Sequence, residues 1–558
     1  MHILGINCFS HDTSACLLRD GEPIAFAEEE RFVRKKHTKD FPGNAINYCL
    51  TQGGIGIDRV DCVAFPFRPG LDFVRGFRHF LRYFPKSYKR FAGQTWMDMN
   101  LKGKTVHFRR EFRYRKKIYF VGHHEAHAAS TFFLSPFDQA AILSIDRGGD
   151  YLSTLLAVGQ GSTIENIKFI RNPHSVGELY SAITSYLGFK PNNGEGKVMG
   201  LAPYGDSTYF DDFLKIISFN GGGDFKLNLD YFPHHYGNGW FSDKFVSKFG
   251  APREPESEME KRFENMAAAL QKMTEDVGIY LANYLHKSTK LDNLCIAGGV
   301  GLNSVMNTQI LQKTPFENLF VQPACNDAGT SLGCALYVWH QILGSERNFR
   351  MEHAFYGPGF NNSEIEKSLQ QNQLGYECVD NPAETAARLI ADKKIVGWFQ
   401  GRMEMGPRAL GGRSILADPR VPEMKDILNH KVKHREGFRP FAPSVLLEYG
   451  PEYFDNCVES PFMLKVLPVK EEKKDVIPAI CHVDGTGRLQ TVAKEQSPLY
   501  WELINEFKKI TGVPVVLNTS FNVRGEPIVL SPQDAIKCFL STQLDYLVIG
   551  DYLVDKSS

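Results

Sequence analysis

The sequence lacks several features that would mark whole classes of protein. Its 11 cysteines include no CxxC pair, so neither a zinc ribbon nor a thioredoxin-type motif is predicted, and reduced, mostly buried thiols are expected. Neither sign of charge dominates, because Lys plus Arg and Asp plus Glu number 64 each. Bulk charge therefore predicts neither nucleic acid nor a membrane as a partner. The sequence offers no apolar run of about 18 residues and no signal-type N-terminus, so we expect a cytoplasmic protein.

The chain is long enough for more than one domain. Its 558 residues predict two or three domains, each with its own core. After Leu343 the sequence becomes polar and irregular, GSERNFRMEHAFYGPGFNNSEIE, before regular structure is predicted again at residues 384–393 and 395–399. We therefore predict a boundary near residue 350, with one domain at 1–350 and a second at 351–558.

One segment departs from the overall balance of charge. Between Phe67 and Lys117, Lys and Arg far outnumber three acids, Asp72, Asp98 and Glu111, and are interleaved with aromatic residues. This pattern is compatible with a nucleic-acid patch. However, apolar residues recur there at helical spacing: Phe73, Phe77, Phe80, Leu81 and Phe84. The spacing favours a helix with a buried apolar face and a solvated basic side.

Two stretches follow the same plan. ILGINCFSHDTSACLLRDGEPIAFAEEE from Ile3 and AILSIDRGGDYLSTLLAVGQGSTIENIKFI from Ala141 both predict a strand, a polar turn, a second strand, a tight turn and a third strand. Helical segments follow each copy, including residues 259–287, and a strand is predicted at 294–297. The duplication indicates two similar lobes that face one cleft.

The motif HHEAH suggests a metal site. On a helix, His123 and His127 project from one face and can reach one ion. Glu125 is misplaced for the HExxH arrangement of a metalloprotease. The histidines of an isolated HxxxH motif more often only cap a helix or satisfy its hydrogen bonds. Here, however, Asp146 and Asp327 both lie at predicted strand ends or turns and can complete a site with two His and two Asp. Such a set suits iron(II), zinc or manganese.

Glycine-rich turns offer candidate nucleotide contacts. Gly148 and Gly149 permit a backbone nest for a phosphate. Gly298, Gly299 and Asn303, in GGVGLN, are candidates to hold an adenosine group. Such turns are also common for packing reasons alone.

The C-terminal part concentrates positive charge in Gly-, Pro- and Ser-rich motifs. These residues are Arg402, Arg408, Arg413, Lys433, Arg435, Arg439 and Arg524. Arg side chains bind phosphate oxygens in a bidentate manner, so a ligand with several phosphates is predicted. For Arg402, Arg413 and Arg435 a structural ion pair remains an equal alternative.

Taken in order, these motifs resemble one family. GINCFSHDTSACLL, AEEERFVRKKH, HHEAHAAS, SIDRGGD, GEGKVMGLAPYG and AGGVGLN resemble the N-terminal domain of the NodU/CmcH carbamoyltransferases, which has the ASKHA (actin, sugar kinase and Hsp70) fold. GRMEMGPRALGGRSILADPR, KHREGFRPFAP and VLNTSFNVRGEPIV resemble the YrdC-like domain of the same family. The resemblance implies an α/β protein of two domains, the first a duplicated ASKHA fold and the second YrdC-like.

The resemblance also implies roles for individual residues. The implied metal ligands are His123, His127, Asp146 and Asp327, with Fe(2+) the expected ion. The implied ATP and carbamoyl-phosphate site contains Arg408, Lys433, Arg439, Ser520 and Arg524, shaped by Asn518 and Asn522, with Mg(2+) accompanying ATP. At the transfer site we hypothesise that His11 is a general base, that Asp12 orients it and that Lys36 stabilises charge.

The implied activity is carbamoyl transfer in two steps. The second domain makes carbamoyl-adenylate from carbamoyl phosphate and ATP, and the first transfers the carbamoyl group to a hydroxyl of a small natural product. Asn7 replaces the catalytic Asp of sugar kinases, which argues against simple phosphoryl transfer. The open alternatives are a threonylcarbamoyl transferase that modifies tRNA and a non-catalytic ATP-binding protein of the ASKHA fold. The acceptor is not predicted, and a homodimer is left open.

Overall fold

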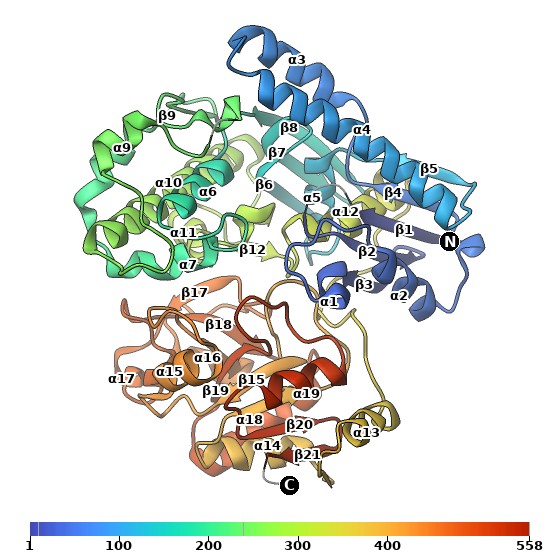
Figure 1. Ribbon diagram of the computed structural model, residues 1–558, viewed down its shortest axis with the longest axis vertical. Coiled ribbons are helices and arrows are strands. Elements are labelled where there is room, and N and C mark those ends of the chain that lie inside the picture. Colours follow the sequence, from blue (N-terminus) through green and yellow to red (C-terminus); the bar gives the residue numbers. More distant parts are fainter. Residues whose placement is uncertain (9–10, 238, 557–558) are drawn as a thin grey trace. The chain divides into compact units, whose positions relative to one another are not determined.

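The computed structural model describes residues 1–8, 11–237 and 239–556 (Figure 1). The chain divides into two compact units, Met1–Glu29 with His37–Arg350, and Glu30–Lys36 with Met351–Ser558. The short segment Glu30–Lys36 thus packs with the C-terminal part of the chain, although it lies within the N-terminal part of the sequence. None of the helices in the described part is long and apolar enough to cross a membrane.

The first unit opens with a five-stranded sheet of order β3-β2-β1-β4-β5. Strands β1 (His2–Asn7), β2 (Ser14–Arg19) and β3 (Glu22–Glu28) pair antiparallel, and β4 (Cys62–Phe65) and β5 (Lys117–Phe120) continue the sheet in parallel. The antiparallel strands are the first of the two predicted copies.

A second sheet repeats this topology. Its order is β12-β11-β6-β7-β8, in which β6 (Gln139–Gly149), β7 (Leu152–Gln160) and β8 (Thr163–Arg171) are antiparallel and β11 (Asn293–Ala297) and β12 (Asn318–Val321) are parallel to β6. The predicted duplication is confirmed, and with it the α/β fold implied by the ASKHA resemblance.

Two helices connect the sheets of the first unit. Helix α5 (His123–Phe132) packs on β6 and β11, α12 (Thr330–Tyr337) packs on β1 and β2, and the two helices pack against each other. The approach is close, because a Cβ added to Gly5 of β1 would lie 1.8 Å from the carbonyl oxygen of Ser331. This packing brings the start of α5 and the turn before α12 to the same place.

The remaining helices and strands of the first unit cover these layers or project from them. They are α1 (Glu29–Val33), which continues into the second unit, α2 (Gly43–Gly53), α3 (Leu71–Tyr83), α4 (Tyr88–Glu111), α6 (Val176–Tyr186), α7 (Glu195–Leu201), α8 (Phe210–Phe213), β9 (Ile217–Phe219), β10 (Phe225–Leu227), α9 (Asp243–Phe249), α10 (Lys261–Thr289) and α11 (Ser304–Lys313). Helix α10 and strand β11 confirm the helix and the strand predicted at 259–287 and 294–297.

The predicted helix in the basic segment is present, but its predicted burial is wrong. Helix α3 contains the apolar stripe, yet Phe73, Phe77 and Leu81 are exposed, and so is Phe84, which follows the helix. Helical spacing shows that a helix has an apolar face, but it does not show whether another element covers that face.

The second unit is built on one nine-stranded sheet of order β13-β21-β20-β14-β15-β19-β16-β18-β17. Its strands are β13 (Glu377–Cys378), β14 (Val396–Phe399), β15 (Arg413–Ala417), β16 (Ala442–Leu446), β17 (Lys465–Pro468), β18 (Thr486–Val492), β19 (Val515–Ser520), β20 (Tyr546–Ile549) and β21 (Tyr552–Asp555). Its helices are α13 (Asn362–Gln371), α14 (Pro382–Ala391), α15 (Met424–Ile427), α16 (Gly450–Tyr453), α17 (Glu471–Lys474), α18 (Pro498–Thr511) and α19 (Pro532–Leu540). This unit is also α/β, as the YrdC-like resemblance implies.

Two arginines hold the segment Glu30–Lys36 in the second unit. The buried Arg31 donates from Nη2 to the carbonyl oxygen of Gly406 at 2.6 Å. Arg34 donates to the carbonyl oxygens of Pro527 and Ile528 at 2.9 and 2.7 Å. A backbone carbonyl that loses such a charged donor loses a strong hydrogen bond, so these contacts make the segment part of the second unit.

Candidate metal centre and anion site

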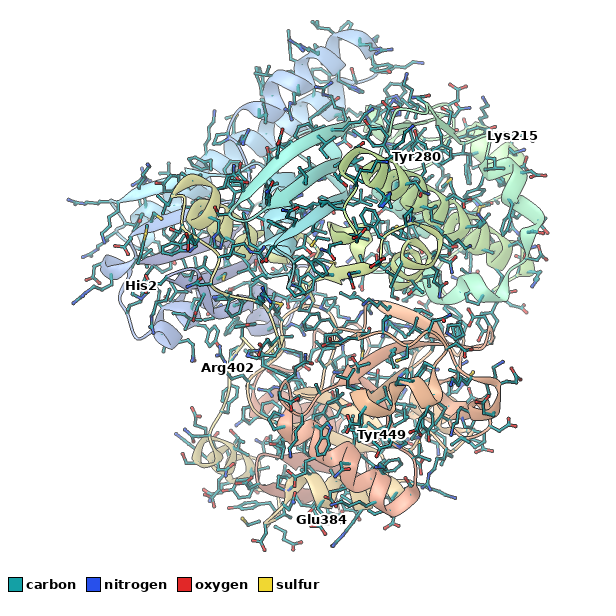
Figure 2. The ribbon with its side chains drawn as sticks, turned by 180° about the vertical axis from the view of Figure 1, so that it is seen from behind. His2, Lys215, Tyr280, Glu384, Arg402 and Tyr449 are labelled. Atoms are coloured by element: carbon teal, nitrogen blue, oxygen red, sulfur yellow. The ribbon has the colours of Figure 1, made fainter. Side chains whose placement is uncertain are left out.

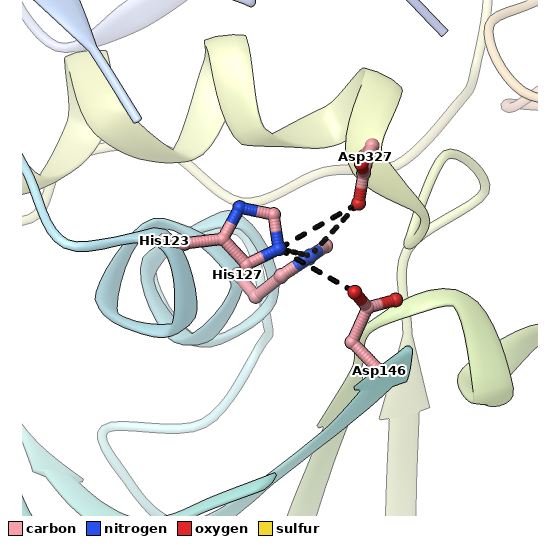
Figure 3. Close-up of side chains that lie close together, drawn as sticks. All are labelled: His123, His127, Asp146 and Asp327. Atoms are coloured by element: carbon pink, nitrogen blue, oxygen red, sulfur yellow. Dashed lines mark hydrogen bonds and ion pairs between the residues drawn. The ribbon is translucent and has the colours of Figure 1, made fainter. Parts of the chain in front are cut away.

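The two histidines of the HxxxH motif converge at the start of α5. Gly122 precedes the helix in an extended conformation, and the helix begins at His123. Because His123 and His127 lie one turn apart, their rings share a face, and their Nε2 atoms are 3.1 Å apart (Figure 3). The side chain of His127 is fully buried.

Two carboxylates complete the cluster from other elements. Asp146 lies near the end of β6, and its Oδ2 is 3.5 Å from His123 Nε2. Asp327 lies in the turn before α12, and its Oδ1 is 3.5 Å from His127 Nε2 and 3.7 Å from His123 Nε2. One ligand atom of each of the four residues lies within 4.8 Å of the others, so they could hold one ion (Figure 3).

The electrostatics of this cluster favour a cation. Burial raises the pKa of Asp146, but its hydrogen bond to His123 and the neighbouring imidazoles outweigh burial and hold that pKa well below its usual range. Burial lowers the pKa of His123, while Asp146 and Asp327 outweigh this effect and bring it to about 9. Two buried carboxylates thus draw positive charge onto an adjacent imidazole, which is the role that a bound divalent ion would take over.

Backbone amides fix the orientation of Asp146. Gly299 N donates to its Oδ1 at 2.8 Å, and Gly148 N donates to its Oδ2 at 3.1 Å. The start of α5 is held similarly, because His123 N donates to Asp150 Oδ2 at 2.8 Å. These are the outer contacts that typically orient metal ligands.

The glycines of the two turns allow close packing near the cluster. A Cβ added to Gly149 would lie 2.2 Å from Cγ of His123, and one added to Gly298 would lie 2.1 Å from the carbonyl oxygen of Ile145. Asn303 accepts from Met306 N and pairs with Gln271, so it caps α11. These contacts give the three residues structural reasons to be present, and their nucleotide role stays a prediction.

The other two residues of HHEAH point to different partners. His124 is buried and contacts Ser144 Oγ through Nδ1 at 2.9 Å, and burial lowers its pKa to about 3. Glu125 forms an ion pair with Arg68 at 3.4 Å. Both are therefore outside the group of four.

His11 and Asp12 form a hydrogen-bonded pair beside this cluster. His11 Nδ1 is 2.9 Å from Asp12 Oδ2, and His11 Nε2 is 4.0 Å from Asp327 Oδ2. Burial lowers the pKa of His11, but Asp12 and Asp327 outweigh it and raise that pKa to about 9. The buried Asn7 links this turn to the Asp327 turn by donating to the carbonyl oxygens of Asp12 and Asp327, both at 3.0 Å.

A second histidine on Asp12 was missed by sequence reasoning. His37 Nδ1 lies 2.7 Å from Asp12 Oδ1, and Asn326 Nδ2 donates to Asp12 Oδ2 at 3.0 Å. Asp12 adopts the left-handed conformation, with φ of 57°. His37 closes the RKKH motif, but nothing in that motif shows that the chain returns to Asp12 at this residue.

Lys36, one position earlier, belongs to the second unit. Its charge is among those that lower the pKa of Lys433, after burial and the charge of Arg435. Its predicted role beside His11 stays a prediction.

In the second unit, Lys433 organises the end of β19. The buried ammonium donates to the carbonyl oxygen of Ser520 at 2.5 Å, to the carbonyl oxygen of Asn522 at 2.9 Å and to Asn522 Oδ1 at 2.7 Å. Ser520 Oγ donates to Asn522 Oδ1 at 2.8 Å. The structure therefore brings together three of the residues predicted to bind carbamoyl phosphate or ATP.

Arginines gather around this loop. Burial and the charges of Arg408, Arg435 and Arg439 hold the pKa of Arg488 well below its usual range. Arg524 is close enough for its charge to lower the pKa of Arg439, after burial. Apart from Arg439, which forms an ion pair with Glu436 at 3.7 Å, these half-buried or exposed guanidinium groups lie close enough to repel one another, which indicates a site for an anion with several charges.

Arg488, on β18, was not predicted from the sequence. It lies in GTGRLQ, a stretch typical of an ordinary strand with one cationic side chain. Its Nε is buried without a hydrogen-bond partner among the described residues. Only the fold brings it to the other arginines.

Three residues of the predicted anion site have internal partners. Arg402, labelled in Figure 2, donates to the carbonyl oxygens of Tyr356 and Gly357. The buried Arg413 donates to four carbonyl oxygens, including that of Gln400 at 2.8 Å. Asn518 Nδ2 contacts Ser444 Oγ and Gln490 Oε1, both at 3.1 Å, so it lies within the sheet.

Comparisons with known proteins agree on one family. The family described as "Carbamoyltransferase N-terminus" matches residues 2–336, and "Carbamoyltransferase C-terminus" matches residues 387–556. The nodulation protein NolNO of Sinorhizobium fredii is 39% identical over 99% of this chain and 80% of its own length. The nodulation protein NolO of Bradyrhizobium diazoefficiens is 42% identical over 78% of this chain and 79% of its own length. The protein sll1178 of Synechocystis is 43% identical over 100% of this chain and 97% of its own length.

Similar solved structures are distant. Full-length HypF in its phosphate- and nucleotide-bound form shares 14% identity over 62% of this chain and 56% of its own, with a TM-score of 0.30. Similarity at this level adds nothing to the assignment.

Proposed function

This chain belongs to the carbamoyltransferase family and is a carbamoyltransferase, and we propose that it forms carbamoyl-adenylate in its second unit and transfers the carbamoyl group in its first. The observation that carries the proposal is the pairing of two different sites in one chain. One is a cluster of cationic side chains around the buried Lys433, and the other is the His and Asp cluster around His127.

The first reaction would need an anion site that holds several phosphates. Carbamoyl phosphate gives up its phosphate to water, and an oxygen of the resulting carbamate attacks the α-phosphorus of ATP, which forms carbamoyl-adenylate and releases pyrophosphate. Lys433 holds the loop of Ser520 and Asn522 in place, and Arg439 and Arg488 would supply positive charge to bound phosphates. Positioning and charge neutralisation of this kind account for most catalysis at phosphorus.

The second reaction would need a base and an acceptor. His11 would take the proton of the acceptor hydroxyl in its neutral form, which its pKa of about 9 makes the minor form near neutral pH. The hydroxyl oxygen would attack the carbamoyl carbon, and AMP would leave. Asp12 holds Nδ1 of His11, which leaves Nε2 as the atom that can face the acceptor. This is the division of roles between a histidine and its orienting carboxylate.

The cluster in the first unit fits a divalent metal. Two imidazole nitrogens and two carboxylates converge, and amides of Gly148 and Gly299 orient one carboxylate. A mixed nitrogen and oxygen set of this kind suits iron(II), zinc or manganese, and we propose Fe(2+). When bound, the ion would supply a Lewis acid for the carbamoyl or phosphate oxygen.

Covalent linkage of the two activities has a physical benefit. Carbamate and carbamoyl-adenylate are lost to water, and joining two sites in one chain raises the effective concentration of the second site to about the millimolar range.

We propose a small hydroxylated acceptor and a cytoplasmic location.

The test is pyrophosphate release from ATP with and without carbamoyl phosphate. Wild type should release pyrophosphate only with carbamoyl phosphate, Lys433→Ala should lose this release, and His123→Ala should keep it. Arg388→Ala, a cation on the exposed side of α14, is the matched control for Lys433 and should behave as wild type. If threonine and bicarbonate support the reaction and carbamoyl phosphate does not, the proposal is wrong and the chain acts as a threonylcarbamoyl-type enzyme. If ATP is bound without turnover, the chain is a nucleotide-binding protein only.

A further inference from the structure

The helix α3 presents an apolar surface to solvent. Its outer face consists of Phe73, Val74, Phe77 and Leu81, together with Phe84, which directly follows the helix. Leu81 is 62% exposed and Phe84 is 64% exposed, whereas large apolar side chains of a folded domain are usually buried. Exposed large apolar side chains that gather on one helix are typical of an interaction site.

Aromatic rings extend the outer face toward α4. Phe73 and Phe77 stack at 6.5 Å between ring centres, and Phe91 of α4 contacts Phe77 at 5.9 Å and Phe80 at 4.7 Å. Farther along α4, Trp96 is 70% exposed. Ring contacts of Phe91 therefore join α4 to the outer face of α3.

The opposite side of α3 fixes the helix to the first unit. The His79 ring lies 5.9 Å from the ring of Tyr151 and its Nε2 contacts the carbonyl oxygen of His235 at 3.0 Å. Arg75 donates to the carbonyl oxygen of Asp150 at 2.6 Å. Because this side is occupied, the outer face cannot turn inward without breaking these contacts.

Positive charge is concentrated on α3 and α4. From residue 71 to residue 111 the sequence has ten Lys and Arg and three Asp and Glu, a surplus of seven positive charges. Several of these cations are exposed: Arg78, Arg82, Lys86, Lys89, Lys102, Arg109 and Arg110. The chain as a whole is neutral, so the surplus is local.

The charge discriminates between possible partners. A second copy of the same surface would place two positive surpluses against each other, which opposes association. Single-stranded nucleic acid would use the aromatic rings for stacking, but Val74, Leu81, Met99 and Val106 are also exposed and offer no ring. Exposed aliphatic and aromatic side chains beside Lys and Arg are typical of a helix that lies in the headgroup region of an anionic bilayer.

We propose that the outer face of α3, with the adjoining surface of α4, docks the protein on an anionic membrane surface. Phe73, Phe77 and Leu81 would enter the boundary between headgroups and acyl chains, and Arg78 and Arg82 would contact lipid phosphates. None of the helices in the described part of the chain is long and apolar enough to span the bilayer.

Vesicle flotation of the full chain tests this proposal. The chain should float with vesicles of phosphatidylcholine and phosphatidylglycerol, should bind less to phosphatidylcholine alone, and should be released by salt, which screens surface charge. Phe77→Ser with Leu81→Ser should weaken binding about tenfold. Arg78→Ala and Arg82→Ala should each weaken it about fivefold.

Matched controls separate the outer face from general surface effects. Leu214→Ser and Ile510→Ser also remove exposed apolar side chains, which are 56% and 52% exposed, and should leave binding unchanged. Carbamoyl-phosphate-dependent pyrophosphate release should be normal in all these variants, so loss of docking is distinguished from loss of folding or of the proposed activity. The proposal would be overturned if the chain bound neutral and anionic vesicles equally, or if the Leu214 and Ile510 variants lost vesicle binding as much as the outer-face variants do. It would also be overturned if light scattering showed a dimer that the outer-face variants abolish. Binding of single-stranded RNA without binding of vesicles would overturn it as well.

Discussion

At the residue scale, His127 and His124 are neighbours with different expected roles. Both are buried on α5, but His127 faces Asp327 at 3.5 Å whereas His124 contacts Ser144. His127→Gln should weaken binding of a divalent metal by at least about a hundredfold, because even changes in the outer contacts of a metal site cost 10- to 100-fold. Metal per chain, measured by mass spectrometry after purification, should fall to near zero.

The same substitution at the neighbouring position provides the control. His124→Gln also replaces a buried imidazole of α5 but should leave the metal content near that of wild type. Equal metal content in all three proteins would show that the cluster is not a metal site.

Asp12 gives a second prediction at this scale. Its carboxylate contacts imidazole nitrogens of His11 and His37 and accepts from Asn326, and an amide in its place has a single acceptor oxygen. Asp12→Asn should keep the fold, since Asn tolerates the left-handed conformation. Carbamoyl transfer should fall by about a hundredfold or more, while pyrophosphate release stays normal.

Asp20→Asn is the matched control for this change. Asp20 also has a positive φ, of 50°, but it is exposed at the turn between β2 and β3. It should retain both reactions. An equal loss of pyrophosphate release and transfer in Asp12→Asn would contradict the assignment of Asp12 to transfer alone.

Single residues differ in how well the sequence predicted them. The pairing of His123 with His127 follows from local helix geometry, so the motif alone predicted it. His37 and Arg488 were missed because their partners, Asp12 and the other arginines, lie far away in sequence. Arg402 and Arg413 are of a residue type that often binds ligands, and they lie in glycine-rich motifs. In the structure, however, both donate to carbonyl oxygens of the same chain.

At the element scale, the hairpin of β6 and β7 sets the position of His123. Gly149, near its turn, would place an added Cβ 2.2 Å from the His123 ring. Gly149→Ala should therefore displace this ligand and lower the bound metal several-fold, with little effect on the fold. Gly196→Ala, in α7, meets no atom within 4 Å and should leave metal binding unchanged. Calorimetric titration of each variant with metal would compare their metal affinities, and similar affinities would contradict the steric explanation.

Periodicity predicted which elements form better than what covers them. The strands of both copies, α10 and β11 have patterns that fix their type, because alternation and helical spacing are local properties. The burial of α3 was predicted wrongly, since the cover of an apolar face comes from distant chain or from another molecule. This difference is why the outer face of α3 became visible only in the structure.

At the scale of the whole molecule, the chain enters the second unit twice. Residues 30–36 join a unit that otherwise begins at Met351. The motif AEEERFVRKKH was recognisable, but its charged side chains are compatible with packing in either unit. The sequence therefore could not show in which unit they pack. A function assigned to the C-terminal part can therefore depend on residues near the N-terminus.

Arg34 provides the test of this dependence. It donates to the carbonyl oxygens of Pro527 and Ile528, just after Asn522 and Arg524 in the proposed anion site. Arg34→Ala should lower the kcat/KM of pyrophosphate release by about tenfold, since a hydrogen bond from a charged group contributes about 1.5–3 kcal/mol. Arg19→Ala, which removes a similar bond to the carbonyl oxygen of Gly53 in the first unit, should leave this value unchanged. If both variants release pyrophosphate as wild type does, residues 30–36 do not support adenylate formation, and the second unit works without them.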